Sequence, residues 1–178
     1  YVTAATTLSA GNDSLFLFDI STWGSVQYLG SVDNNTASTK GLSAIAAAGN
    51  YAYATNPFGA NFKTCKPGAN CAQLQIFTTT NPAAIPSPVN FLIPTSSPPY
   101  VLGSGGQAAG QTIFYKDGYL YLGLTKTASG PEFNIIDVRD PLHPKWIGGY
   151  SIGNTINQIY VRGGFAYVAS DDKSRELI

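Results

Sequence analysis

The chain has 178 residues, of which 44% are hydrophobic and only 11% are charged, well below the roughly 25% usual for soluble domains. Ten basic and ten acidic side chains give no net charge, and neither sign forms a block, which argues against nucleic-acid partners and anionic lipid surfaces. No apolar run approaches the ~20 residues of a membrane helix, so we expect no direct membrane insertion in this segment. With 19 Gly, 11 Pro and no helical periodicity, residues 1–178 are predicted to form a single all-β domain.

The first predicted strands span residues 15–21 and 26–30. The apolar residues that begin the first of them follow one another without alternation, which is typical of a strand covered on both faces. Strand pairs of the same kind recur at residues 74–80 and 89–93, and at 133–139 and 145–149. Asp19, Thr78 and Asp137 occupy equivalent places, at spacings of 59 and 59. We interpret Asp19 and Asp137 as structural residues that accept backbone N–H bonds in the turns after these strands.

A hairpin pattern precedes these strands in three copies, at residues 44–53, 112–121 and 158–167. Each copy has an isoleucine four residues before a Gly-Asn, Asp-Gly or Gly-Gly pair, and aromatic residues at the first and third positions after the pair. Such pairs accept the positive φ of a two-residue turn, and the alternation is typical of a half-buried strand. Because the third-position residues Tyr53, Tyr121 and Tyr167 recur in register, we expect them to pack between repeats, with a sugar-stacking platform as the alternative.

Four short antiparallel strands in a unit of roughly 45 residues are typical of a propeller blade. The sequence therefore predicts a β-propeller-like array of four-stranded antiparallel blades, about three and a third repeats in an incomplete ring. The approximate units are residues 1–31, 42–94, 110–151 and 156–178, the last of them partial. Alanines at positions 44 and 46–48 are interpreted as small residues on an innermost strand that is crowded near the axis.

The two ends of the chain fall inside units rather than between them. Tyr1-Val2 aligns with Tyr53-Ala54 in a second strand, and Leu177-Ile178 stands where a third strand is expected to begin. A propeller closes typically with four to eight blades. We therefore expect a segment of a longer protein. The alternative is a chain whose open sheet edges are completed by association, since exposed edges and apolar faces otherwise aggregate.

Two long insertions interrupt the repeat, at residues 56–72 and 95–109. Loops of this length on a regular scaffold are where function is usually carried. Phe58, Phe62 and Tyr100 lie in these insertions, and the repeat does not require them. We therefore take these three as the candidate ligand-binding residues.

Cys65 and Cys71 are the two cysteines of the chain, and they flank a turn-rich Pro-Gly loop. They are predicted to close a small disulfide ring; the alternative is two free thiols in a cytosolic loop. An even count around such a turn in a chain of low charge suits an oxidising compartment, which places the protein outside the cell or at its surface. Two cysteines and the distant His143 are too few ligands for a metal site.

The sequence offers no catalytic constellation. His143 lies in a Pro-Leu-His-Pro turn, where we expect it to be exposed. Asp171-Asp172 lacks the rest of a calcium loop, and the glycine-rich segment 103–106 lacks the Lys-Ser/Thr of a phosphate cradle. We predict neither catalytic residues nor a metal or cofactor, and hence a protein that is not an enzyme.

One part of the chain is similar to a known repeat. Its matching segments are residues 133–138, Asp140-Pro141 with Pro144, Trp146-Ile147-Gly148, and residues 165–169. They resemble the LVIVD repeat of bacterial and archaeal surface proteins, and the resemblance implies β-propeller blades. The unit at 112–150 matches best, whereas the second unit departs with Thr78 for the motif aspartate. Similar repeats also occur as surface regions behind prepilin-type amino termini, which implies a pilus-type context.

We therefore expect a non-enzymatic structural, adhesive or recognition module that binds a protein or glycan at a cell surface through residues 56–72 and 95–109. A first alternative is a ligand-binding or enzymatic propeller whose axial site is completed by absent blades. A second alternative is a filament or assembly subunit that is completed by neighbouring copies of itself.

Overall fold

The computed structural model describes residues 13–33, 41–57, 72–91, 109–126, 130–172 and 174. Within this part of the chain the regular structure is β-strand, apart from one short 3₁₀ helix, η2 (Pro82–Ala84). The predicted all-β class is therefore confirmed. The described residues include no helix with the length and apolar character needed to cross a membrane.

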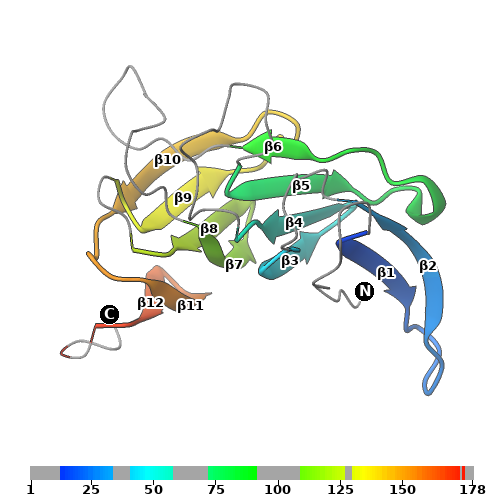
Figure 1. The fold of residues 1–178 in the computed structure, drawn as a ribbon, viewed down its shortest axis with the longest axis horizontal. Coiled ribbons are helices and arrows are strands. Elements are labelled where there is room, and N and C mark those ends of the chain that lie inside the picture. Colours follow the sequence, from blue (N-terminus) through cyan, green and yellow to red (C-terminus); the bar gives the residue numbers. More distant parts are fainter. Residues whose placement is uncertain are drawn as a thin grey trace.

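The strands form four antiparallel sheets that follow one another along the chain (Figure 1). The first sheet has two strands, β1 (Leu15–Asp19) and β2 (Gln27–Val32). The second has four, β3 (Ala44–Ala48), β4 (Tyr51–Thr55), β5 (Leu74–Thr78) and β6 (Val89–Phe91). The third has four, β7 (Gly110–Lys116), β8 (Tyr119–Leu124), β9 (Phe133–Asp137) and β10 (Lys145–Tyr150). The last has two, β11 (Ile156–Arg162) and β12 (Phe165–Ser170).

Within each sheet the strands pair in the order of the sequence, and none of these sheets closes on itself. The predicted hairpins are present as β3–β4, β7–β8 and β11–β12. Asp117 and Gly118 both have positive φ, of 51° and 83°, which is the backbone of a type I′ turn. The strands expected at residues 1–2 and 177–178 lie outside the described residues.

Consecutive sheets pack face to face on three apolar cores. The first core joins β1 to β4 and β5, the second joins β4 and β5 to β7, β8 and β9, and the third joins β7 and β8 to β11 and β12. Strand β7 contacts both β3 and β11, so the first strands of successive sheets are neighbours. In Figure 1 these strands lie on the inside of a fan, and β2, β6 and β10 lie along its outer rim.

A run of consecutive apolar residues predicts a strand that is covered on both faces. This prediction holds for β5 but is wrong for β1. Strand β5 has neighbours on both sides, so Ile76 lies in one core and Phe77 in the next, each 1% exposed or less. In β1, Leu17 is buried but Phe18 is only half-buried, and its ring meets the edge of Tyr28 at 5.9 Å between centroids. The described residues place a sheet on only one side of β1, and this is the physical reason for the difference.

Candidate functional site

The residues that the sequence singles out for binding, Phe58, Phe62 and Tyr100, lie outside the described residues, as do Cys65 and Cys71. The structure does show where their loops are anchored. The insertion at 56–72 leaves the sheet at the end of β4 and returns at the start of β5, and the insertion at 95–109 ends at the start of β7. These anchoring positions form a common base.

Backbone hydrogen bonds join the anchoring positions directly. The N–H of Asn56 donates to the carbonyl of Gln73 at 3.0 Å, and the carbonyl of Asn56 accepts from the N–H of Gly110 at 3.0 Å. Gly110 is required at this point, because a Cβ there would lie 2.5 Å from the carbonyl oxygen of Gln73. The end of the second insertion is thus bonded to the base of the first.

Polar side chains reinforce the same base. The Ser43 hydroxyl donates to the carbonyl of Gly110 at 2.7 Å and lies 2.8 Å from the Thr55 hydroxyl. Thr55 and Asn56 are completely buried. Buried polar groups that are hydrogen-bonded fix one arrangement, because leaving them unpaired is costly. Hydrogen bonds therefore join the points where the two insertions are anchored.

The motif carboxylates of Asp19 and Asp137 hold turns. Asp19 accepts from the N–H of Ser21 at 2.8 Å, and this bond lowers the pKa of Asp19. Asp137 accepts from the N–H of Arg139 at 3.0 Å and from its guanidinium at 3.0 and 2.5 Å. The guanidinium, followed by the N–H, lowers the pKa of Asp137 to about 2. Both carboxylates lie at strand ends and bond the backbone of the turn that follows.

The motif tyrosines occupy equivalent register positions but differ in exposure. Tyr53 is 2% exposed, and its ring stacks on that of Tyr115. Burial, followed by the neighbouring Tyr115, raises the pKa of Tyr53 to about 12. Tyr121 is half-buried beside Phe133, with 6.4 Å between ring centroids. Tyr167 is 46% exposed.

A cavity of about 190 Å³ lies between β1 and the β3–β4 hairpin, and sequence reasoning missed it. Its lining residues are Leu17, Ile45, Ala46, Ala47, Gly49, Tyr51, Ala52 and Thr79. Ala47 is exposed at this cavity, so the predicted crowding of the alanine strand is wrong on this face. The available signal was Ala47 itself, which stands where the next hairpin has the large Tyr115.

Several large apolar side chains are exposed on the end sheets and on the outer strands. Trp23 is fully exposed between β1 and β2, and Phe165 is 70% exposed on β12.

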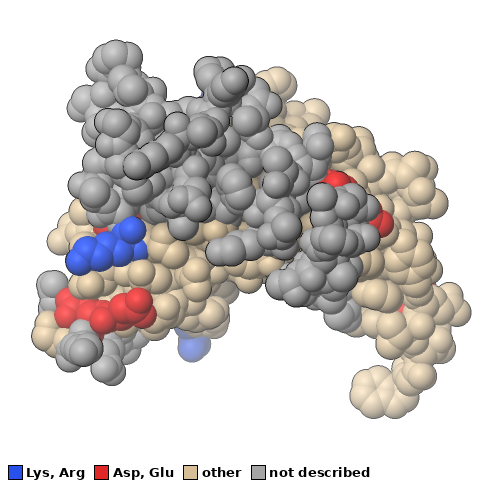
Figure 2. All heavy atoms as spheres, in the orientation of Figure 1, with Lys and Arg blue, Asp and Glu red and all other residues tan. Residues whose placement is uncertain are grey.

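His143, as expected, is an exposed turn residue, and its Nδ1 lies 2.9 Å from Oδ2 of Asp140. Figure 2 shows that most of the described surface on this side is uncharged. In the described segments, no three His, Cys, Asp or Glu side chains come together as a metal site.

No family model matches the chain, and neither a curated protein nor a solved structure matches it significantly.

Proposed function

We propose that the chain is a non-enzymatic binding module at the cell surface, built from propeller blades, which recognises a protein or glycan through its two insertions. The observation that carries this proposal is the shared base of the insertions, where Asn56 is bonded to both Gln73 and Gly110. Both insertions are anchored on this base, in which Thr55 and Asn56 are completely buried, and long loops on a regular scaffold are where binding is usually carried. Phe58, Phe62 and Tyr100 are the residues that would contact the ligand.

The propeller arrangement is supported by two features of the sheets. The complete sheets have the strand order β3-β4-β5-β6 and β7-β8-β9-β10, each a simple meander, as in a propeller blade. Their first strands are neighbours, since β7 contacts β3 and β11. The resemblance of residues 133–148 and 165–169 to the LVIVD repeat agrees with this arrangement and favours a surface protein, including one of pilus type.

The binding experiment uses the full chain on a panel of immobilised glycans and extracellular matrix proteins. The triple variant F58S/F62S/Y100S should lose at least tenfold in affinity for whichever member binds. Tyr150→Ser, which removes a 68% exposed tyrosine from the rim strand β10, is the matched control and should bind normally. Equal binding by the triple variant would contradict the assignment to the insertions. Release of smaller products from the panel, followed by mass spectrometry, would instead establish an enzyme.

The proposed location is tested separately from binding. The natively produced protein should gain two hydrogen masses on reduction, because an extracytoplasmic chain would carry the Cys65–Cys71 bridge. An unchanged mass would argue for free thiols and a reducing compartment.

A further inference from the structure

Tyr167 has the register of a buried inter-sheet residue, but no ring contact to another sheet is seen for it among the described residues. It is the third residue after its hairpin turn, as are Tyr53 and Tyr121. Tyr53 packs on the next sheet along the chain, where its ring lies 5.8 Å from that of Tyr115. On β12 the same face carries Tyr167, which is 46% exposed, and Phe165, which is 70% exposed. The other face of β12 is already packed in the third core through Val168.

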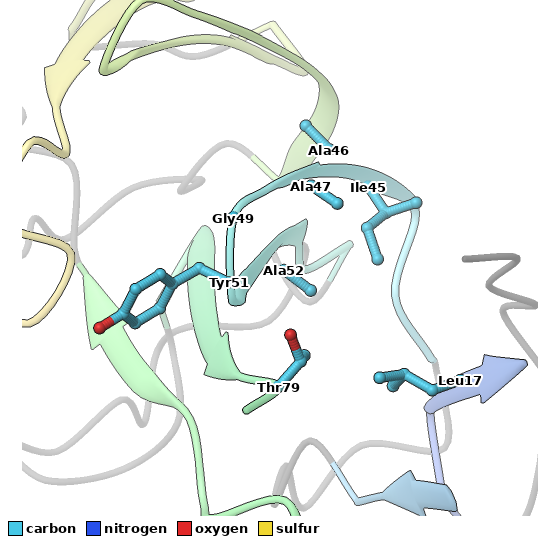
Figure 3. A pocket seen from close by; sticks show the side chains of 8 residues that line it. All are labelled: Leu17, Ile45, Ala46, Ala47, Gly49, Tyr51, Ala52 and Thr79. Atoms are coloured by element: carbon cyan, nitrogen blue, oxygen red, sulfur yellow. The ribbon is translucent and has the colours of Figure 1, made fainter. Parts of the chain in front are cut away.

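The cavity beside β3 is the reciprocal feature. Figure 3 shows the side chains of Leu17, Ile45, Ala47, Ala52 and Thr79 directed toward the hollow, and those of Ala46 and Tyr51 directed away from it. Ala47 is the residue before the last paired residue of β3. Tyr115 holds the equivalent position in β7. The cavity therefore lies where a preceding sheet would place its third-position tyrosine. Its volume of about 190 Å³ suits an aromatic ring, since an apolar cavity of about 150 Å³ binds benzene.

The strand edges match in the same way. In both complete sheets the second strand pairs with the third, as β4 with β5 and β8 with β9. Among the described residues β12 pairs only with β11, and β1 pairs only with β2. By position in its sheet, β12 corresponds to a second strand whose third strand is not seen among the described residues. Strand β1 corresponds to a third strand whose second strand is likewise not seen there. Transferring the observed registers sets Phe165 opposite Asp19 and Tyr167 opposite Leu17, and Leu17 itself lines the cavity.

We propose that two copies of this chain assemble by sheet completion, with β12 of one protomer adding to β1 of the other and Tyr167 filling the other protomer's cavity. Strand addition supplies main-chain hydrogen bonds, and the pocket for Tyr167 sets the register. Two reciprocal joins give a closed dimer in which all sheets of the described region have four strands. Because the chain has no net charge, two copies of it do not repel each other as they approach. This self-association is separate from ligand binding by the insertions.

The first test is the molar mass of the full chain by light scattering. We expect twice the 18.8 kDa of one chain, and Tyr167→Ser should raise the dimer dissociation constant at least tenfold. Tyr150→Ser removes a tyrosine that is 68% exposed, against 46% for Tyr167, from β10 and should leave the dimer intact. A monomeric wild-type chain, or a dimer indifferent to Tyr167→Ser, overturns the proposal. If the chain is a monomer, the competing occupant of the cavity is Tyr1 of the same chain, which aligns with Tyr53. Tyr1→Ser tests that alternative.

The second test fixes the register with two singly substituted proteins. A mixture of Phe165→Cys protein and Asp19→Cys protein should give a disulfide-linked dimer under mild oxidation, and neither protein alone should do so. A mixture of Phe165→Cys with Phe18→Cys is the matched control, because neighbouring residues on a strand point to opposite faces. Equal cross-linking in both mixtures would overturn the proposed pairing. Because the insertions are unchanged in every variant, failure here leaves the binding test unaffected.

Discussion

The ring of Tyr53 stacks on the ring of Tyr115, with 5.8 Å between their centroids and 12° between their planes. Tyr53 belongs to β4 and Tyr115 to β7, so the pair joins the two four-stranded sheets. The aromatic residue that recurs after each hairpin turn is thus an inter-sheet contact at this position. Its burial makes it a sensitive place to test how the sheets hold together.

Tyr53→Ala should destabilise the protein by about 3 kcal/mol, because removing a buried aromatic side chain loses its apolar contacts and leaves a cavity. Chemical denaturation followed by circular dichroism measures this change. Tyr150→Ala, at a position that is 68% exposed, should change the free energy of unfolding by no more than about 0.5 kcal/mol. Equal effects of the two substitutions would contradict the importance of the stacked pair.

The raised pKa of Tyr53 predicts a loss of stability at alkaline pH. Tyr53 is neutral in both states below its ordinary pKa of 10.0, whereas in the folded protein its pKa is about 12. Between these values the unfolded chain releases a proton that the folded chain retains, so stability falls as pH rises from 10 toward 12. Tyr53→Phe should show a smaller fall over this window in urea denaturation. Parallel curves for the two proteins would refute the assignment to Tyr53.

The ion pair of Asp137 and Arg139 predicts acid sensitivity. The pKa of Asp137 is lowered from 3.8 to about 2, so its contribution to stability is complete above 3.8 and is lost as pH falls toward 2. In Arg139→Gln the carboxyl loses its largest stabilising contact, and NMR titration should show the pKa of Asp137 rising toward 3.8. Arg162→Gln, on the hairpin strand β11, should leave that pKa unchanged.

Gly110→Ala should destabilise the protein by about 1–3 kcal/mol, because the added Cβ lies 2.5 Å from a backbone oxygen that cannot move aside. Gly148→Ala is the matched control, since no atom lies within 4 Å of a Cβ at that strand position. Thermal unfolding of the two variants measures the difference. Because Gly110 belongs to the base of the insertions, its alanine variant should also bind the proposed ligand more weakly than the control does.

Local sequence signals were sufficient for the hairpins but not for the surroundings of each strand. Asp117-Gly118 predicts a tight turn because both residues tolerate positive φ, and both adopt it. The apolar run of β1 gave the wrong prediction, because whether Phe18 is covered depends on a neighbouring sheet and not on its own strand. Burial of a face is a tertiary property, so alternation along one strand predicts it only when the neighbours are known.

The candidate site was predictable only as two insertions. The repeat shows that residues 56–72 and 95–109 are extra, but nothing in the sequence brings Asn56 next to Gly110, since that contact depends on how consecutive sheets pack. The cavity beside Ala47 was missed for a related reason. A small residue indicates crowding when a neighbour fills the space and a hollow when no neighbour does, and composition alone does not distinguish the two.

The three apolar cores have a consequence for how the molecule opens. No buried residue belongs to two of them, and each joins only consecutive sheets. Such an array resembles a linear chain of coupled units, in which the outermost units have one neighbour and the inner units have two. In the monomer, amide hydrogen exchange should therefore be fastest in β1–β2 and β11–β12 and slowest in β4, β5 and β8. The single chain would open first at its two end sheets, and completion of these sheets in the proposed dimer should slow their exchange.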